Sequence, residues 1–405
     1  MNEVTLSNNL KQYIQTNCQS VKKKIHPHMS SMQSSFLDSL HDLFMKAHIK
    51  WMEVQKSNEI TEVSSVSKGD DYSYIPENVR QIIEKSLKHH KTYQFAMHDR
   101  NITVSFFANA NKTYSPKRWL EYTKKIFIWL SVISIFSSRN CVKHLHIYVY
   151  LTNEKKQIPR TPDVPIGRKH VNTAFTTSCT SNTEIHLFRE EEWFKVFIHE
   201  SFHSYGLDFS TMDTQSCDVK IKEVFGISTD SRLYESYTEA WAEIIYICFL
   251  VHFSMVSSPK WENPSLKYIK KIEEKLSYEI IFSLLQCIKV LKHNNISCTE
   301  FFSFTKESKA KTIQLYKEDT PVFSYYIVKS VLLYYVNDFI EWTLVKNRGS
   351  INFHKTNTTI QSYISFIYNH FKESGYRESI EELEKCLQTN YPSYLNTMRM
   401  TLHDD

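Results

Sequence analysis

Residues 196–206, VFIHESFHSYG, constrain the fold of this chain more than any other segment. His199 and His203 are four residues apart, so on one helix their imidazoles lie on the same face, and Glu200 directly follows the first histidine. Two imidazoles at this spacing can bind zinc, and the neighbouring carboxylate can take a proton from a water molecule. The segment therefore predicts a short helix that presents a metal site.

The flanking residues indicate where this helix begins and ends. The acidic run at 190–192 supplies the negative charge that a helix N-terminus favours, and Trp193, Val196 and Phe197 form a stripe for burial. Gly206 is one of only six glycines in 405 residues, and its freedom to adopt positive φ suits a turn directly after the second histidine. The alternative is a helix with two ordinary histidines.

Length and composition exclude several classes of protein. With 405 residues, 41% of them apolar, the chain can bury a large core and would usually form two lobes or domains. The formal charge of +5 is spread along the sequence, which indicates no nucleic-acid partner. The apolar runs at 126–136 and 244–256 are too short for a membrane span, and the start, MNEV, lacks a secretion signal. We expect a soluble, intracellular, cytoplasmic protein.

The eight cysteines are scattered without the paired spacing of a metal site. Several lie within apolar stretches, which is typical of buried thiols. We therefore expect free cysteines in a reducing compartment. They are Cys18, Cys141, Cys179, Cys217, Cys248, Cys287, Cys298 and Cys386.

The hydrophobic pattern divides the chain into four parts. Residues 1–56 show helical periodicity, and a polar linker rich in Ser and Asp follows at 57–78. Residues 79–206 are predicted to form an α+β lobe that ends in the helix with the histidines, and residues 207–405 are mainly helical. Within the lobe we expect strands at 92–97, 102–108, 144–151 and 184–188 and a helix at 116–136.

A second helix that can complete the site is predicted from the sequence LYESYTEAWAE. Catalytic zinc takes three protein ligands and leaves a fourth position for water. Glu235, Glu239 and Glu243 recur at intervals of four and share one face, which continues with Tyr246 and Leu250. Because carboxylates on a buried face need partners, we expect this face to meet the two histidines. The alternative is a solvated acidic stripe on the surface.

An HExxH helix followed by a helix with Glu-x-x-x-Glu resembles the gluzincins, the zinc peptidases that include thermolysin and neprilysin. The resemblance covers about residues 171–251. It implies one Zn²⁺ ion per chain and a general base, which is Glu200 here. The implied zinc ligands are His199, His203 and Glu239.

The resemblance also implies a second acid one turn after the ligand, where Glu243 would hold a ligand histidine in the correct tautomer. We prefer Glu239 as the ligand because Ala240 and Ala242 follow it and would put small residues beside the metal helix, as the family's second motif commonly does. The alternative places the ligand at Glu235 with Glu239 behind it. A metzincin site is disfavoured because the third histidine of that family would fall at Phe209.

Four more residues are candidates for contact with substrate. Asn172 and Ala174 lie where the family has an edge strand that pairs with substrate backbone, although an ordinary strand would give the same pattern. Tyr325 and Tyr326 are candidates for stabilising the transition state, and packing is the alternative for each. The implied fold is α+β, a zincin-like core whose antiparallel or mixed sheet packs on the metal helix, followed by a largely helical lobe.

The implied reaction is hydrolysis of a peptide bond in a peptide or protein substrate. One alternative is a catalytically inactive zinc-binding structural or interaction protein, which would need the ligands but no free base. Another is a helical interaction module without metal. Metal analysis separates this last class from the other two.

Overall fold

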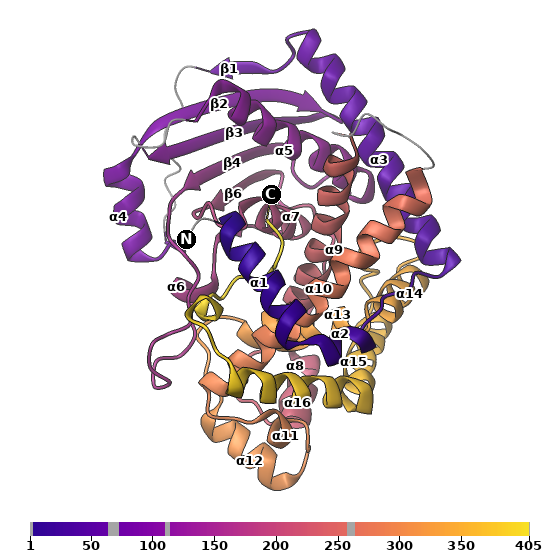
Figure 1. Ribbon diagram of the computed structural model, residues 1–405. Coiled ribbons are helices and arrows are strands. Elements are labelled where there is room, and N and C mark those ends of the chain that lie inside the picture. Colours follow the sequence, from indigo (N-terminus) through magenta and orange to yellow (C-terminus); the bar gives the residue numbers. More distant parts are fainter. Residues whose placement is uncertain (1–2, 64–72, 110–113, 257–263, 405) are drawn as a thin grey trace.

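Six strands in the first half of the chain form one mixed β-sheet, which lies beside a larger body of helices (Figure 1). The computed structural model describes residues 3–63, 73–109, 114–256 and 264–404. The strand order is β1-β2-β3-β4-β6-β5, and the predicted α+β class with a mixed sheet is confirmed. The strands are β1 (Thr61–Val63), β2 (Leu87–Met97), β3 (Arg100–Asn109), β4 (His144–Leu151), β5 (Ala174–Thr176) and β6 (Asn182–Leu187).

Helices account for most of the remaining described residues, as the sequence predicts for the second half of the chain. Those before the sheet ends are α1 (Glu3–Asn17), α2 (Gln19–Lys24), α3 (Ser31–Lys56), α4 (Glu77–Ser86), α5 (Pro116–Phe136) and α6 (Arg168–Val171). Those that follow are α7 (Trp193–Ser204), α8 (Gln215–Phe225), α9 (Leu233–Val256), α10 (Pro264–His293), α11 (Cys298–Phe301), α12 (Lys306–Leu315), the π-helix η1 (Phe323–Val328), α13 (Lys329–Tyr334), α14 (Val336–Lys346), α15 (Asn357–Lys372), α16 (Ser374–Thr389) and the 3₁₀ turn η2 (Ser393–Asn396).

The pairing of the strands follows from their connections. β2 and β3 form an antiparallel hairpin, in which His98 and Asp99 have φ angles of 47° and 62°, as a tight hairpin turn requires. β3 and β4 are parallel because α5 crosses between them. β4 and β6 are also parallel, whereas β5 pairs with β6 in the antiparallel direction and forms one edge of the sheet.

α5 has the predicted bounds, and local chemistry explains its start. The Ser115 hydroxyl accepts a hydrogen bond from the Arg118 N–H, and Pro116 suits the first turn of a helix. On the buried side, Trp129 Nε1 donates to the Ser201 hydroxyl of α7 at 2.6 Å. α5 therefore links the sheet to the helix that carries the histidines.

Both faces of the sheet are covered, because side chains alternate along each strand. On β3, Phe106 packs toward α5, with its ring centroid 5.4 Å from that of Trp119. The next residue, Phe107, lies on the opposite face, where it stacks on Tyr150 and joins a small apolar cluster with Val79 of α4.

One continuous hydrophobic core extends from α1 to the C-terminal residues. α3 packs against α5, α9 and α10, so the N-terminal helical segment shares this core. The predicted linker at 57–78 contains β1 and the start of α4, and its residues 64–72 lie outside the described part of the chain. The linker thus marks the change from helices to sheet.

The C-terminal segment, residues 397–403, runs through the interior and ends near α7 (Figure 1). Its backbone is held by buried acids: the N–H groups of Met400 and Thr401 donate to Glu192 at 2.7 and 2.6 Å. The Leu402 N–H donates to Glu279 at 2.9 Å. The sequence pattern gave no sign of this segment's burial.

By length and composition α9 could cross a membrane. From the sequence we counted only residues 244–256 of this helix as an apolar run, which is too short for a span. However, 78% of its most apolar window is buried inside the protein, and core helices of soluble proteins pass the same test. Burial by other helices explains its apolar composition.

Candidate metal centre

α7 has the predicted shape, and all of its residues are buried. It begins after Glu192, which has a φ of 58°, and ends at Ser204, two residues before Gly206 with a φ of 67°. A Cβ on Gly206 would lie 3.2 Å from the Cβ of Cys179. Glycine therefore allows both the positive φ of the turn and the close packing of the backbone against Cys179.

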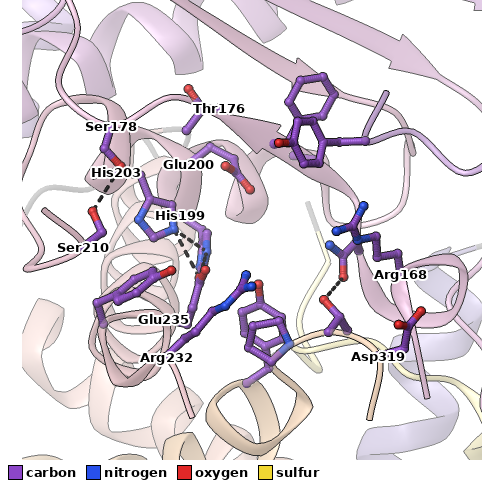
Figure 2. A pocket seen from close by; sticks show the side chains of 18 residues that line it. Arg168, Thr176, Ser178, His199, Glu200, His203, Ser210, Arg232, Glu235 and Asp319 are labelled. Atoms are coloured by element: carbon purple, nitrogen blue, oxygen red, sulfur yellow. Dashed lines mark hydrogen bonds and ion pairs between the residues drawn. The ribbon is translucent and has the colours of Figure 1, made fainter. Parts of the chain in front are cut away.

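Three side chains converge beside the C-terminal half of α7 (Figure 2). The Nε2 atoms of His199 and His203 are 3.1 Å apart. An oxygen of Glu235, from the first turn of α9, lies 3.2 Å from the first Nε2 and 3.3 Å from the second. The three potential ligand atoms are all within 4.8 Å of one another, a spacing that one metal ion can bridge.

The other ring nitrogen of each histidine contacts a buried carboxylate. His199 Nδ1 lies 2.8 Å from an oxygen of Glu239, and His203 Nδ1 contacts Asp208. A carboxylate at Nδ1 holds the ring with Nδ1 protonated and leaves Nε2 as the acceptor. Both imidazoles are therefore oriented so that Nε2 faces the same point.

The positions of the acids on α9 favour the alternative ligand over the preferred one. Glu235, the alternative ligand, lies beside both Nε2 atoms, whereas Glu239 lies deeper and also pairs with Lys195. Glu243, expected to hold a histidine, is a further turn away, and its nearest cation is Lys329 Nζ at 3.8 Å. The interval of four placed the acids on the correct face, but it cannot fix how far α9 is shifted along α7.

The electrostatics of the cluster favour a cation. Burial alone would lower the pKa of His203, but the carboxylates of Asp208 and Glu235 raise it well above its ordinary value. Burial opposes ionisation of Glu235 as well, yet the two imidazoles hold its pKa well below the usual range. Positive charge is thus stabilised here, and a metal ion would take the place of the protons on the imidazoles.

A cavity of about 320 Å³ opens at this cluster, and Glu200 lies at its edge with 8% of its surface exposed. Burial raises the pKa of Glu200, while the two imidazoles oppose the rise. Ala174, the first residue of the edge strand β5, lines the same cavity, as does Asn172 two residues before it. The Asn172 side chain accepts a hydrogen bond from the Thr320 hydroxyl at 3.0 Å.

The two candidate tyrosines have different positions. Tyr325 lines the cavity, and its ring centroid is 6.0 Å from that of His199. Tyr326 is fully buried and donates to the Met398 carbonyl at 2.6 Å, so it is a packing residue. The π-helical turn of η1 carries both, and such turns are frequent at functional sites.

Several residues in and around the site were missed in the sequence. Asp208 is an isolated acid among apolar residues, a signal that could have marked it as a partner for a histidine. Tyr234 contacts the His203 ring edge-on, and Met400 of the C-terminal segment lines a smaller adjoining cavity. Arg168 and Arg232 also line the main cavity, and no motif distinguishes them from other arginines.

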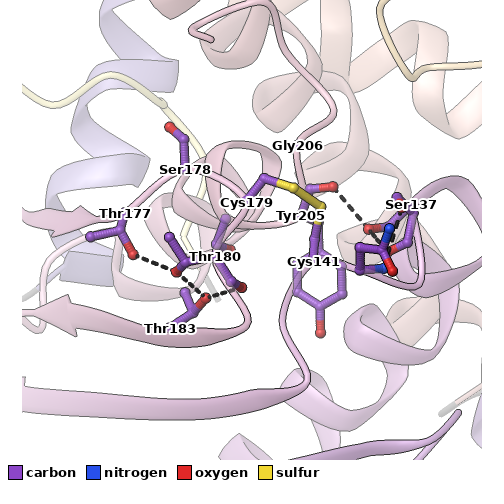
Figure 3. The surroundings of a disulfide bond; sticks show 12 residues. Ser137, Cys141, Thr177, Ser178, Cys179, Thr180, Thr183, Tyr205 and Gly206 are labelled. Carbon is purple, nitrogen blue, oxygen red and sulfur yellow. Dashed lines mark hydrogen bonds between the residues drawn. A yellow bond between two sulfur atoms is a disulfide. The ribbon is translucent and has the colours of Figure 1, made fainter.

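A disulfide lies at the end of α7 and corrects the expectation that every cysteine is free (Figure 3). Cys141 and Cys179 are 38 residues apart in sequence, with Cα atoms 4.6 Å apart. The bridge joins the segment between α5 and β4 to the loop before β6. The Cys179 N–H also donates to the carbonyl of Ser204 at 3.1 Å, which connects this loop to the end of α7. The other six cysteines form no disulfide.

Comparison with known proteins gave no relatives: no family model matches the chain, and neither the curated proteins nor the solved structures contain a match.

Proposed function

We propose that this protein is a zinc-dependent peptidase with a zincin-like catalytic core. One observation carries the proposal: two imidazole Nε2 atoms and a carboxylate converge at the wall of a cavity that Glu200 also lines. An inactive zinc-binding protein would need the three ligands but not the neighbouring carboxylate. The proposed ligands are His199, His203 and Glu235.

The donor set suits zinc. Two nitrogen ligands and one carboxylate oxygen are the set found in many catalytic zinc sites, and such sites keep a fourth position open. The carboxylates at Nδ1, from Glu239 and Asp208, raise the basicity of the two imidazoles. When bound, zinc would supply Lewis-acid polarisation of the scissile carbonyl and of the attacking water.

The residues around the ligands can perform the remaining steps. The Glu200 carboxylate accepts a proton from the attacking water and returns it to the leaving amine nitrogen when the C–N bond breaks. Burial raises the pKa of Tyr325 well above its ordinary value, so its hydroxyl stays protonated and can donate a hydrogen bond to the carbonyl oxygen. The edge of β5 can pair with the backbone of an extended substrate.

The test compares wild type with Glu200→Gln and with a matched surface control, Glu53→Gln, on a proteome-derived peptide library. We expect all three proteins to bind about one zinc ion and only Glu200→Gln to lose cleavage, because an amide cannot accept the water proton. Cleavage by Glu200→Gln at the wild-type rate would disprove the base. Zinc without cleavage in wild type would indicate the inactive zinc-binding protein, and absence of zinc would indicate the metal-free helical module.

A further inference from the structure

Arg232 lies at the edge of the main cavity, three residues before the proposed ligand Glu235 (Figure 2). Its side chain is exposed, and it comes from the residue that directly precedes α9. The guanidinium group is therefore fixed to the same element as the metal site. A substrate bound across the metal site would pass within reach of this residue.

The backbone at Arg232 is in the left-handed region, with a φ of 42°. This conformation is unfavourable for a residue with a Cβ, and such residues cluster at functional sites. It is retained because the Arg232 carbonyl accepts hydrogen bonds from the Glu235 N–H at 2.9 Å and from the Ser324 hydroxyl at 3.3 Å. The surrounding structure thus holds Arg232 in a conformation that glycine would adopt more easily.

The acids around Arg232 already have other partners. Asp230 pairs with Lys222 at 2.7 Å, and Glu235 contacts the two histidines. Glu318 accepts hydrogen bonds from the Tyr316 hydroxyl and from a backbone N–H. Among the described residues, none forms an ion pair with Arg232. Its positive charge is therefore available to a ligand in the cavity.

Arg168, the other arginine of the cavity, is engaged differently. Its guanidinium carbon lies 5.4 Å from the ring centroid of Tyr74, a cation–π contact. Asp319 lines the same cavity (Figure 2). Among the described residues Arg232 forms no cation–π contact, and the charges of Asp230 and Glu318 act on it without forming an ion pair. Arg168 is therefore a suitable comparison.

We propose that Arg232 is a specificity residue that selects substrates with a carboxylate close to the scissile bond. A guanidinium binds a carboxylate through two parallel hydrogen bonds, which an amide of the same shape cannot reproduce. The carboxylate can belong to an acidic side chain or to the C-terminus of a peptide. This inference rests on the proposed peptidase function, since it assigns the substrate class of the same site.

The experiment uses two pairs of peptides cleaved by the zinc-loaded protein, built on a sequence taken from the library screen. One pair exchanges Glu for Gln beside the cleaved bond, and the other exchanges a C-terminal acid for the amide. We expect wild type to favour the acid in one pair by at least about 10-fold in kcat/KM, the usual size of a charged hydrogen-bond contribution. The pair that responds identifies the source of the carboxylate.

Arg232→Gln should lose this preference, Arg232→Lys should keep part of it, and the matched control Arg168→Gln should retain it. Arg232→Glu should reverse it in favour of a peptide with Lys at the same position. Zinc content and the unfolding temperature show whether each variant is folded. Equal kcat/KM for acid and amide in wild type, or an unchanged preference in Arg232→Gln, would overturn the inference.

Binding measurements separate this inference from the proposed function. Fluorescence anisotropy reports the affinity of labelled peptides for zinc-loaded Glu200→Gln, with and without the Arg232→Gln change. If wild type cleaves no peptide, the peptidase proposal fails. The selection of carboxylates would still be supported if acid peptides bind more tightly than amide peptides and Arg232→Gln removes this difference. Equal binding of acid and amide peptides would disprove it.

Discussion

His199 Nδ1 lies 2.8 Å from Glu239, while Nε2 of the same ring lies 3.2 Å from Glu235, so two acids one helical turn apart hold opposite edges of one imidazole. α9 therefore fixes both the orientation of His199 and the third donor of the cluster. The acids differ in their surroundings, because Glu239 also pairs with the buried Lys195, whereas Glu235 lines the cavity. The two should consequently respond differently to substitution.

We expect Glu235→Ala to remove most of the bound zinc, because it deletes a proposed ligand. Glu239→Gln should lower zinc affinity by about 10- to 100-fold, the usual effect of losing a partner that orients a ligand. Glu243→Gln should leave affinity near the wild-type value, since Glu243 contacts neither histidine. Competition with a chromophoric chelator measures these affinities, and circular dichroism shows whether each variant is folded. Loss of zinc in Glu239→Gln with wild-type affinity in Glu235→Ala would restore Glu239 as the ligand.

Asp208→Asn tests the partner of the second histidine. An asparagine keeps the shape but removes the negative charge that supports a protonated Nδ1, so zinc affinity should fall by about 10- to 100-fold. Asp230→Asn is the matched control, because this aspartate is mostly exposed and pairs with Lys222. The same chelator assay applies. If both variants bind zinc equally well, the contact between Asp208 and His203 does not orient the ligand.

The sequence predicts those features that local chemistry determines. The bounds of α5 follow from Ser115 and Pro116 at its start, and the end of α7 follows from Gly206. The face of α9 that carries the acids also follows from spacing, because a helix repeats every 3.6 residues.

Features set by contacts between distant segments could not be predicted. The shift of α9 along α7 decides whether Glu235 or Glu239 reaches the histidines, and both positions satisfy the same periodicity. The disulfide joins residues 38 positions apart, and cysteine spacing alone does not give its pairing. The burial of the C-terminal segment depends on Glu192, directly before α7, and on Glu279 of α10, and it leaves no periodic signal.

Removal of the disulfide should destabilise the protein. The double variant Cys141→Ser/Cys179→Ser should lower the free energy of unfolding by about 2–4 kcal/mol, since the bridge restricts the unfolded chain over a separation of 38 residues. Urea denaturation measures the change. The control is Cys386→Ser, because Cys386 is partly exposed and forms no disulfide. A reducing agent should lower the stability of wild type to that of the double variant and leave the double variant unchanged. Equal stability of wild type with and without reductant would show that the bridge contributes nothing.

A pair of buried histidines should make stability sensitive to acid. His48 Nδ1 lies 3.2 Å from His252 Nε2 between α3 and α9. Burial, together with the charge of Lys124, lowers the pKa of His48 to about 4, and burial and neighbouring cations lower that of His252 to about 3. In the unfolded chain both titrate near 6.5. As the pH falls below 6.5 the unfolded state therefore binds protons first, and stability decreases down to about pH 4.

Replacing one of these histidines should reduce that sensitivity. Each contributes a slope of about 1.4 kcal/mol per pH unit between the two sets of pKa values. His252→Gln should therefore reduce the slope of stability against pH by about this amount between pH 4.5 and 6. Urea denaturation at several pH values measures the slope, and the exposed His26→Gln serves as control. His252→Gln must be compared by slope, because the buried amide also lowers stability at every pH. A slope identical to that of wild type would mean that His252 keeps its ordinary pKa in the folded protein, and its burial beside His48 would then have no part in acid unfolding.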